Sequence, residues 1–407
     1  MAHKKRRFQI IVILLLFVIY FFVAARPIPR EIVLAPKWIS SLVNNLSFSE
    51  SSAESGFAAA SVFLPFSLGE HFGYVDTSGR FAFNKIKTND IYISQNMWAE
   101  FDAEPPIIEI KNVYEETIVY IQDTIQQAAR GYPVLLDDKI FILGSEQNAL
   151  SEIGNDGKIR WTYEFGAPLT CIDASAGLVI TGSLDGIIEI FNSSGERIFY
   201  YEPGGSRYEV ILGCAISRDG SHIGIISGID QQRFLLLERF GNSGGDYRVV
   251  YHEYLDTGFR RPVRILFTDE DRRLVFERTG GVSCYNIRTR RGIFIPLDGE
   301  VYTIEDSGSL EKNPNKQNLQ TSFVQDSSQG FLFMIVSNPS SLNEKKLIGI
   351  KFPQDRWFNI SQSRASAPDA IFLSASIKSE DVFLGRTGSM LIVGGGSALI
   401  SFELEEK

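Results

Sequence analysis

The sequence predicts an all-β fold, because a unit of short strands and tight turns occurs twice in succession at residues 139–163 and 178–201. Shifting the first unit by 38 positions aligns Gly144 with Gly182, Leu150 with Ile188, Ile153 with Phe191, Gly157 with Gly195, Trp161 with Phe199 and Tyr163 with Tyr201. Gly-Ser, Asp-Gly and Ser-Gly pairs separate the apolar runs, as expected for strands joined by hairpin turns. A period near 40 residues built from strands is typical of a β-propeller, in which each blade covers the apolar face of its neighbour.

The same pattern extends from about Ser67 to the end of the chain. A hairpin at residues 72–83 and strands at 90–94 and 97–102 form the expected first blade, and residues 117–129 allow a helical turn or two. About 340 residues at roughly 40–48 per blade predict a single propeller of about seven four-stranded blades, with six or eight as alternatives. We expect the last strand, residues 398–404, or the lead-in near 62–66 to complete a blade shared by the two ends, because an open edge promotes aggregation.

An apolar segment at residues 8–25 precedes this domain, with Gln9 as its only strongly polar residue. As a helix it would span about 27 Å, close to the thickness of the hydrocarbon core of a bilayer. The four basic residues 4–7 outnumber Arg26 and Arg30 on the other side, which favours a cytoplasmic amino terminus. We therefore predict an uncleaved transmembrane signal anchor, with a signal peptide cleaved after residues 23–25 as the alternative.

The predicted organisation is a cytoplasmic basic tail (1–7), the transmembrane helix (8–25), a linker (26–66) and the propeller domain (67–407). Within the linker, apolar residues recur at steps of three and four: Trp38, Ile39, Leu42, Val43 and Leu46. This spacing predicts a short amphipathic helix that lies either on the membrane surface or against the propeller. The serine-rich residues 47–55 are typical of a flexible tether.

Composition excludes some functions. The formal net charge is −9 even with the basic tail included, which argues against general nucleic-acid binding because neutralising phosphates requires an excess of Lys and Arg. The three cysteines, Cys171, Cys214 and Cys284, are far apart and form no CxxC motif. We interpret Cys171 and Cys214 as small buried hydrophobic residues, with a disulfide or a reactive thiol as the alternatives.

Two segments resemble repeats of the quinoprotein-like (PQQ-like) and WD40-like β-propeller superfamilies. They are residues 140–163, with Asp156-Gly157 before Trp161, and residues 178–201, with Gly182-Ser183 and Asp185-Gly186. The resemblance covers about two blades well and four more loosely, and no blade ends in the Trp-Asp pair typical of WD40 repeats. It implies a propeller and leaves the activity open, because propellers host many functions.

No catalytic group of residues is evident. Quinoprotein dehydrogenases, which the fold resembles, have adjacent cysteines and tryptophan-rich repeats, whereas this chain has separated cysteines and four Trp. The G-x-S-x-G string at residues 241–245 lies in a polar hairpin loop rather than at a strand-to-helix elbow. His3, His71, His222 and His252 lack the spacing of metal ligands, and the Asp-Gly pairs favour turns over calcium binding. We predict no enzyme activity, cofactor, metal or small-molecule substrate.

One basic group stands out from the acidic background. Nine arginines fall within residues 260–291, and we single out six as candidate partner-binding residues: Arg260, Arg261, Arg264, Arg288, Arg290 and Arg291. The planar guanidinium group suits carboxylates, so these residues could dock an acidic partner or lipid headgroups. The alternative is a solvated surface in which interleaved acids, Asp269, Glu270, Asp271 and Glu277, pair with the arginines.

The predicted function is therefore a non-enzymatic scaffold, held by one helix in the cytoplasmic (inner) membrane, that binds protein partners of the cell envelope on the periplasmic or extracellular side. By resemblance, the nearest bacterial role is that of an envelope-assembly factor such as the propeller subunit of the outer-membrane β-barrel assembly machinery. A ligand-sensing propeller is the alternative, and a quinoprotein-type oxidoreductase is the least favoured.

Overall fold

The computed structural model describes residues 32–43, 62–101, 108–121, 131–136, 138–241, 245–255, 258–306, 330–338, 341–352, 365–366, 370–387 and 390–406, together with Phe17 and Tyr20. The chain divides into two units, residues 1–35 with 404–407 and residues 36–403. The fold given below is that of the second, larger unit. The predicted transmembrane segment lies outside the described residues apart from Phe17 and Tyr20, and no helix within them is long and apolar enough to cross a membrane.

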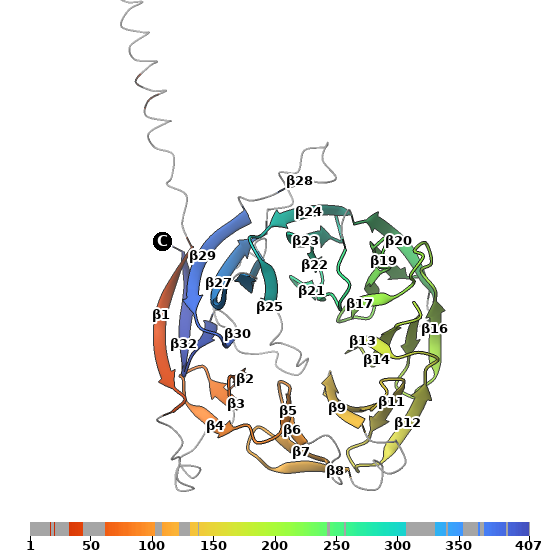
Figure 1. Ribbon diagram of the computed structural model, residues 1–407, viewed down its shortest axis with the longest axis horizontal. Coiled ribbons are helices and arrows are strands. Elements are labelled where there is room, and N and C mark those ends of the chain that lie inside the picture. Colours follow the sequence, from red (N-terminus) through yellow and green to blue (C-terminus); the bar gives the residue numbers. More distant parts are fainter. Residues whose placement is uncertain are drawn as a thin grey trace, which may run out of the picture. The chain divides into compact units, whose positions relative to one another are not determined.

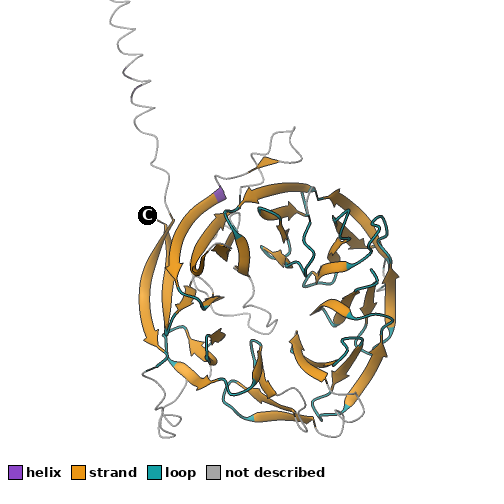
Figure 2. Cartoon of the chain, viewed as in Figure 1, coloured by secondary structure: helices purple, strands orange, loops and turns teal. Residues whose placement is uncertain are grey.

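Eight sheets, which we call blades 1 to 8 in chain order, are set radially around an axis (Figures 1 and 2). Blade 1 contains β2 (Phe63–Leu68), β3 (His71–Asp76) and β4 (Phe81–Ile86); blade 2 contains β5 (Asp90–Ile93), β6 (Met97–Phe101), β7 (Ile108–Asn112) and β8 (Thr117–Ile121). Blade 3 contains β9 (Gly131–Leu136), β10 (Lys139–Gly144), β11 (Ala149–Ile153) and β12 (Ile159–Glu164); blade 4 contains β13 (Leu169–Ser175), β14 (Leu178–Ser183), β15 (Ile188–Phe191) and β16 (Arg197–Tyr201).

The second half of the ring continues in the same way. Blade 5 contains β17 (Ile211–Ile216), β18 (His222–Ser227), β19 (Arg233–Arg239) and β20 (Tyr247–Tyr254); blade 6 contains β21 (Ile265–Thr268), β22 (Arg273–Arg278), β23 (Gly281–Asn286) and β24 (Arg291–Pro296), with β28 (Ala365–Ser366) added in parallel to β24. Blade 7 contains β25 (Glu300–Asp306), β26 (Phe331–Asn338), β27 (Ser341–Lys351) and β29 (Ile371–Lys378). Blade 8 contains β30 (Val382–Thr387), β31 (Met390–Gly395), β32 (Ala398–Glu406) and β1 (Ile32–Ser41). The prediction of an all-β propeller is confirmed.

The predicted number of about seven blades was wrong, since the described residues form eight. The reason lies at the start of the ring, where blade 1 has only three strands. Strands β5 and β6, which we expected to continue the first blade, instead pair with β7 and β8 in a blade of their own. Residues 117–121, where a helical turn was allowed, form strand β8, and residues 122–129 lie outside the described residues.

The predicted amphipathic helix around Trp38 was also wrong, because residues 32–41 form strand β1 at the edge of blade 8. Its contacts follow a period of two. Trp38 Nε1 donates to Thr77 O, Ser40 Oγ donates to Gly79 O, and Leu42 is fully buried, whereas Ile39 is 70% exposed. A helix would have buried Ile39 with Leu42, so tertiary contacts with blade 1 override the local spacing.

The two ends of the ring meet in blade 8, where β1 pairs beside β32. We predicted a shared blade, and the last strand does lie in it, but the partner is β1 rather than the lead-in near residues 62–66, which belongs to β2 of blade 1. Leu42 N donates to Ser397 O at 2.8 Å, which continues the connection beyond the end of β1.

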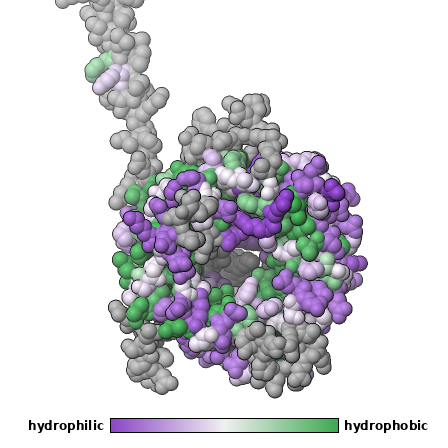
Figure 3. Space-filling model, viewed as in Figure 1, coloured by the Kyte–Doolittle hydropathy of each residue, from purple (hydrophilic) through white to green (hydrophobic). Residues whose placement is uncertain are grey.

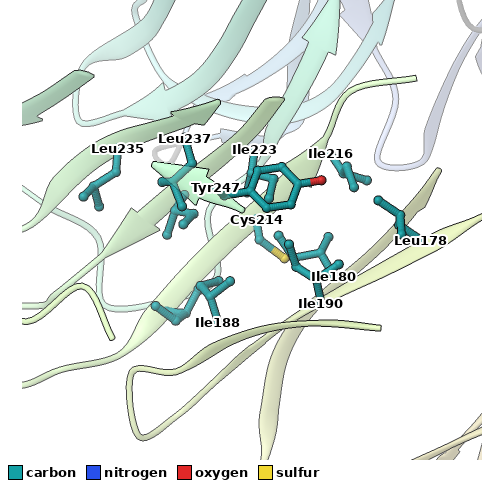
Figure 4. Packing of buried hydrophobic residues seen from close by; sticks show 12 residues of the cluster. Leu178, Ile180, Ile188, Ile190, Cys214, Ile216, Ile223, Leu235, Leu237 and Tyr247 are labelled. Atoms are coloured by element: carbon teal, nitrogen blue, oxygen red, sulfur yellow. The ribbon is translucent and has the colours of Figure 1, made fainter. Parts of the chain in front are cut away.

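Hydrophobic cores lie between successive blades rather than at the axis. Figure 4 shows the core between blades 4 and 5, where Ile180 and Ile190 of one blade face Cys214, Ile216 and Tyr247 of the next. Similar clusters join blades 2 and 3, 3 and 4, 5 and 6, 6 and 7, and 8 and 1. Each sheet therefore buries its apolar faces against its neighbours.

Candidate partner-binding site

The six arginines singled out in the sequence fall into two groups at opposite ends of blade 6. Arg260, Arg261 and Arg264 precede β21, whereas Arg288, Arg290 and Arg291 lie at the turn between β23 and β24. The register separates them: Ile265 pairs with Phe276 and Phe276 with Ser283 at one end of the sheet, while Arg273 pairs with Asn286 at the other end. The six side chains therefore do not form one surface.

The group at the β23–β24 turn is exposed and resembles an ordinary charged surface. Arg290 lies 3.9 Å from Glu238 Oε2 of blade 5, and its own backbone has a positive φ of 55°. The interleaved acids that we considered as partners do pair nearby, since Asp269 contacts both Arg272 Nη2 at 2.9 Å and Arg273 Nε at 3.1 Å. At this end of the blade, the geometry fits the alternative of a salt-bridged surface.

The other group borders a hollow of about 790 Å³ on the inner side of the ring. Its wall is formed by Ser67 of β2, residues 261–264, Glu300 and Val301 of β25, Ser337 of β26 and residues 382–384 of β30. Four blades thus contribute to one site, and two of the six predicted arginines, Arg261 and Arg264, lie in its wall. Figure 3 shows the ring from one side, with hydrophilic and hydrophobic side chains both bordering a central opening. Arg260 is exposed and is not part of the wall.

Arg261 is held in place from several sides. Its guanidinium carbon lies 4.3 Å from the centre of the Phe259 ring, and its Nη1 donates to Glu277 Oε2 and to Pro262 O, each at 3.0 Å. The segment that carries it is also fixed, because Val263 N donates to Leu212 O at 2.7 Å. The guanidinium group is therefore pre-arranged at the edge of the hollow, which lowers the entropy cost of binding a ligand there.

Glu277 of β22 binds both arginine-bearing positions of the wall. Its carboxylate is buried, and Oε2 accepts from both Arg261 Nη1 and the backbone N of Arg264, while its own backbone N donates to Arg264 O. The second oxygen, Oε1, is buried without a hydrogen-bond partner among the described residues. Burial alone would lower the pKa of Arg261, but the hydrogen bonds and charges of Glu277 and Glu300 raise it above its ordinary value. Arg261 therefore stays charged at any physiological pH.

The two ends of the guanidinium group of Arg261 differ in their partners. Nη1 is bound to the buried Glu277, whereas among the described residues Nη2 makes only a long contact of 3.5 Å with Glu300 Oε2, whose side chain is 56% exposed. Arg264 adds a second positive charge to the wall, and its Nη1 donates to Val301 O at 3.3 Å. The hollow therefore presents arginine donors beside a weakly held, solvent-exposed carboxylate.

The structure shows where the sequence motifs considered for catalysis and metal binding lie. The G-x-S-x-G string at residues 241–245 links the paired strands β19 and β20, so no helix follows it. Cys214 and Cys284 are buried and Cys171 is half-buried, and all three are free thiols. In the described residues, His, Cys, Asp and Glu form no group of three able to hold a metal ion.

Sequence reasoning found Arg261 and Arg264 but missed the groups that give them a role. Glu277 was visible only as one of several interleaved acids, and Glu300, Ser337 and residues 382–384 come from later blades. A local charge count contains no signal for such partners, because the ring closure brings residues far apart in the chain into one wall. The repeat itself was the only sequence feature that pointed to this convergence.

Comparisons with known proteins agree with the architecture. A family model described as a beta-propeller protein matches residues 1–340. An uncharacterized protein from Treponema pallidum (strain Nichols) is 28% identical over 282 residues, which are 69% of this chain and 72% of that protein.

Among solved structures, the computationally designed Ika8 protein is similar with a TM-score of 0.51 and 8% identity, over 85% of this chain and 96% of that one. BamB from Moraxella catarrhalis gives a TM-score of 0.48 and 11% identity, over 91% of this chain and 100% of that one. At 8% identity, the likeness to Ika8 concerns the fold alone.

Proposed function

The chain belongs to a family of β-propeller proteins, and from this premise we propose that it is a non-enzymatic scaffold that binds a protein partner at the hollow bordered by Arg261 and Arg264. The observation that carries this proposal is the convergence of four blades on one wall of the ring, which combines charged and polar side chains with apolar ones. Blade-to-blade packing supplies a rigid frame, and the wall adds charged and polar groups to it, as is common for binding sites carried by loops on a fixed scaffold.

The proposed location is the outer side of the cytoplasmic membrane, with the propeller held by the helix at residues 8–25. The support is the length of the apolar segment and the excess of basic residues before it. Proteinase treatment of intact spheroplasts tests this proposal: the large domain should be digested without lysis, while a cytoplasmic marker survives. Full protection of the domain would contradict it.

The narrower proposal is that the partner belongs to the cell envelope and that the scaffold acts in envelope or outer-membrane protein assembly. Crosslinking in intact cells, followed by purification of the tagged full-length chain from membranes, tests it. We expect envelope proteins well above the level recovered with an unrelated tagged membrane protein. Recovery of no envelope protein above that background would count against the proposal.

A ligand-sensing role is the second candidate, because about 790 Å³ falls within the range of about 300–1,000 Å³ typical of small-molecule sites. Under this alternative, a small molecule should co-purify with the native protein and be released on denaturation, where mass spectrometry would detect it. The scaffold proposal expects no such molecule in stoichiometric amount.

A further inference from the structure

We propose that the hollow recognises an acidic, carboxylate-bearing segment of a protein partner, and that the segment's carboxylate replaces Glu300 on Nη2 of Arg261. This inference rests on the scaffold function proposed above and goes further by naming the chemistry of the partner. It also assigns distinct roles to three residues of the wall: Arg261 as the ligand-binding donor, Glu277 as its positioning residue and Glu300 as a competitor built into the site.

Arg261 is held in a fixed orientation. Its Nη1 donates to Glu277 Oε2 at 3.0 Å, and its guanidinium carbon lies 4.3 Å from the centre of the Phe259 ring. These contacts fix the guanidinium plane and direct the remaining Nη2 toward the partly exposed side of the wall, where Glu300 lies. An arginine fixed in this way suits planar recognition of a carboxylate better than a mobile lysine would.

Glu300 marks the position that a ligand's carboxylate would take. Its Oε2 lies 3.5 Å from Nη2 of Arg261, longer than a charge-assisted hydrogen bond of about 2.7–2.9 Å. The Arg261 side chain is 41% exposed and that of Glu300 is 56% exposed, so this ion pair contributes little stability and is readily exchanged. A carboxylate from a partner, placed at hydrogen-bonding distance, would therefore form the stronger interaction.

Both carboxylates near the hollow contact the same arginine. Arg261 pairs through Nη1 with the buried Glu277 and through Nη2 with the exposed Glu300. Displacing Glu300 into solvent leaves Arg261 paired with Glu277 and opens Nη2 to the incoming acid. Because the chain as a whole carries a net charge of −9, the site would act at short range rather than by long-range attraction of acidic partners.

The test uses purified full-length protein in detergent and two labelled peptides, hexaglutamate and hexaglutamine, with binding followed by fluorescence anisotropy. We expect the wild type to bind hexaglutamate at least about tenfold more tightly than hexaglutamine. Arg261→Ala should abolish this preference, whereas Glu300→Gln should increase affinity for hexaglutamate several-fold because it removes the competing charge. Arg290→Ala, at the opposite end of blade 6, is the matched control and should behave as the wild type.

Three outcomes would overturn the inference: no preference for hexaglutamate in the wild type, unchanged binding by Arg261→Ala, or weaker binding by Glu300→Gln. If Arg261→Ala fails to fold because Glu277 loses its partner, Glu300→Gln still decides the matter, since Glu300 is exposed and outside the buried pair.

Crosslinked capture from cells separates the two proposals. A partner captured equally by the wild type and Arg261→Ala would preserve the scaffold role and exclude the carboxylate site, whereas capture by neither would reject the scaffold role itself.

Discussion

Gly195 of blade 4 lies directly against Trp161 of blade 3, so closely that a Cβ atom at Gly195 would be 2.3 Å from Cγ of the indole ring. The same relationship recurs around the ring. A Cβ at Gly157 would meet Tyr120 O at 2.1 Å, and one at Gly79 would meet the Trp38 ring at 2.7 Å. In each case the glycine lies in a hairpin turn and faces the outermost strand of the preceding blade, so these turns act as fixed contact points between blades.

Replacing Gly195 by alanine should therefore destabilise the ring by overpacking, in addition to the strain of its positive φ of 76°. Gly177 provides the matched control, because its φ is 74° and nothing lies within 4 Å of a Cβ there. We expect Gly195→Ala to lose about 1–3 kcal/mol more than Gly177→Ala in denaturant unfolding. Equal losses would show that backbone strain, rather than contact with Trp161, determines the need for glycine.

Trp38 should contribute to closure of the ring. Its half-buried indole packs against the core between blades 8 and 1, donates to Thr77 O at 2.9 Å and covers Gly79. We expect Trp38→Ala to lower the free energy of unfolding by about 3 kcal/mol or more, measured by thermal or denaturant unfolding. Lys37→Ala is the control: its ion pair with Glu403 is exposed and should change stability by less than about 1 kcal/mol. Similar effects of the two variants would contradict a structural role for the tryptophan.

Asp76 should make stability depend on acid pH. Burial alone would raise the pKa of its carboxyl, but hydrogen bonds from Ser78 and Arg80 lower the pKa below its ordinary value of 3.8. A carboxyl with a lowered pKa in the folded state stabilises the protein above its unfolded pKa, and that contribution is lost as the pH falls through the folded value. The free energy of unfolding of the wild type should exceed that of Asp76→Asn by about 1–3 kcal/mol at pH 7. This difference should shrink below about pH 4.

The control for this pH dependence is Asp156→Asn, an exposed residue in the corresponding turn of blade 3. It should change stability by no more than about 0.5 kcal/mol at either pH. A difference between wild type and Asp76→Asn that stays constant from pH 7 to pH 3 would show that the carboxylate charge plays no part.

The thiols should be poorly reactive in the native protein. Burial raises the pKa of Cys284 to about 12, and a hydrogen bond with the Cys171 thiol together with burial raises the pKa of Cys214. We expect a thiol reagent such as Ellman's to modify all three cysteines in denaturant and at most one, Cys171, rapidly in the native state. A count of only one thiol in denaturant would instead reveal a disulfide between Cys171 and Cys214.

The fold was largely predictable because the turns carry their own chemistry. Glycines at positive φ, such as Gly157 and Gly195, mark hairpins wherever a residue with a side chain would be strained, so the repeat is visible in sequence. The blade count was not predictable from this signal, because blade 1 has three strands and its neighbour begins without a distinct boundary. Strand β1 was missed for a different reason: its partner β32 is more than 350 residues away, and its local spacing favours a helix.

The sequence predicted only part of the candidate site. An excess of arginine against an acidic background singled out Arg261 and Arg264, but it grouped them with Arg288, Arg290 and Arg291, which the strand register places at the other end of the sheet. Strand direction decides which end of a blade a residue occupies, and proximity in sequence does not. The contacts of Glu277 form when β22 pairs beside β21 within blade 6, and the contact of Glu300 forms only once blades 6 and 7 are side by side.

The pairing of β1 with β32 has a consequence for biosynthesis. Among the described strands, β1 is synthesised well before its partner β32, so the ring cannot close until β32 has been made. A product that stops early would keep the flank of β31 uncovered and be open to association with other chains. The uncovered edge of β31 would thus be a structural feature by which cellular quality control could distinguish a chain that lacks β32.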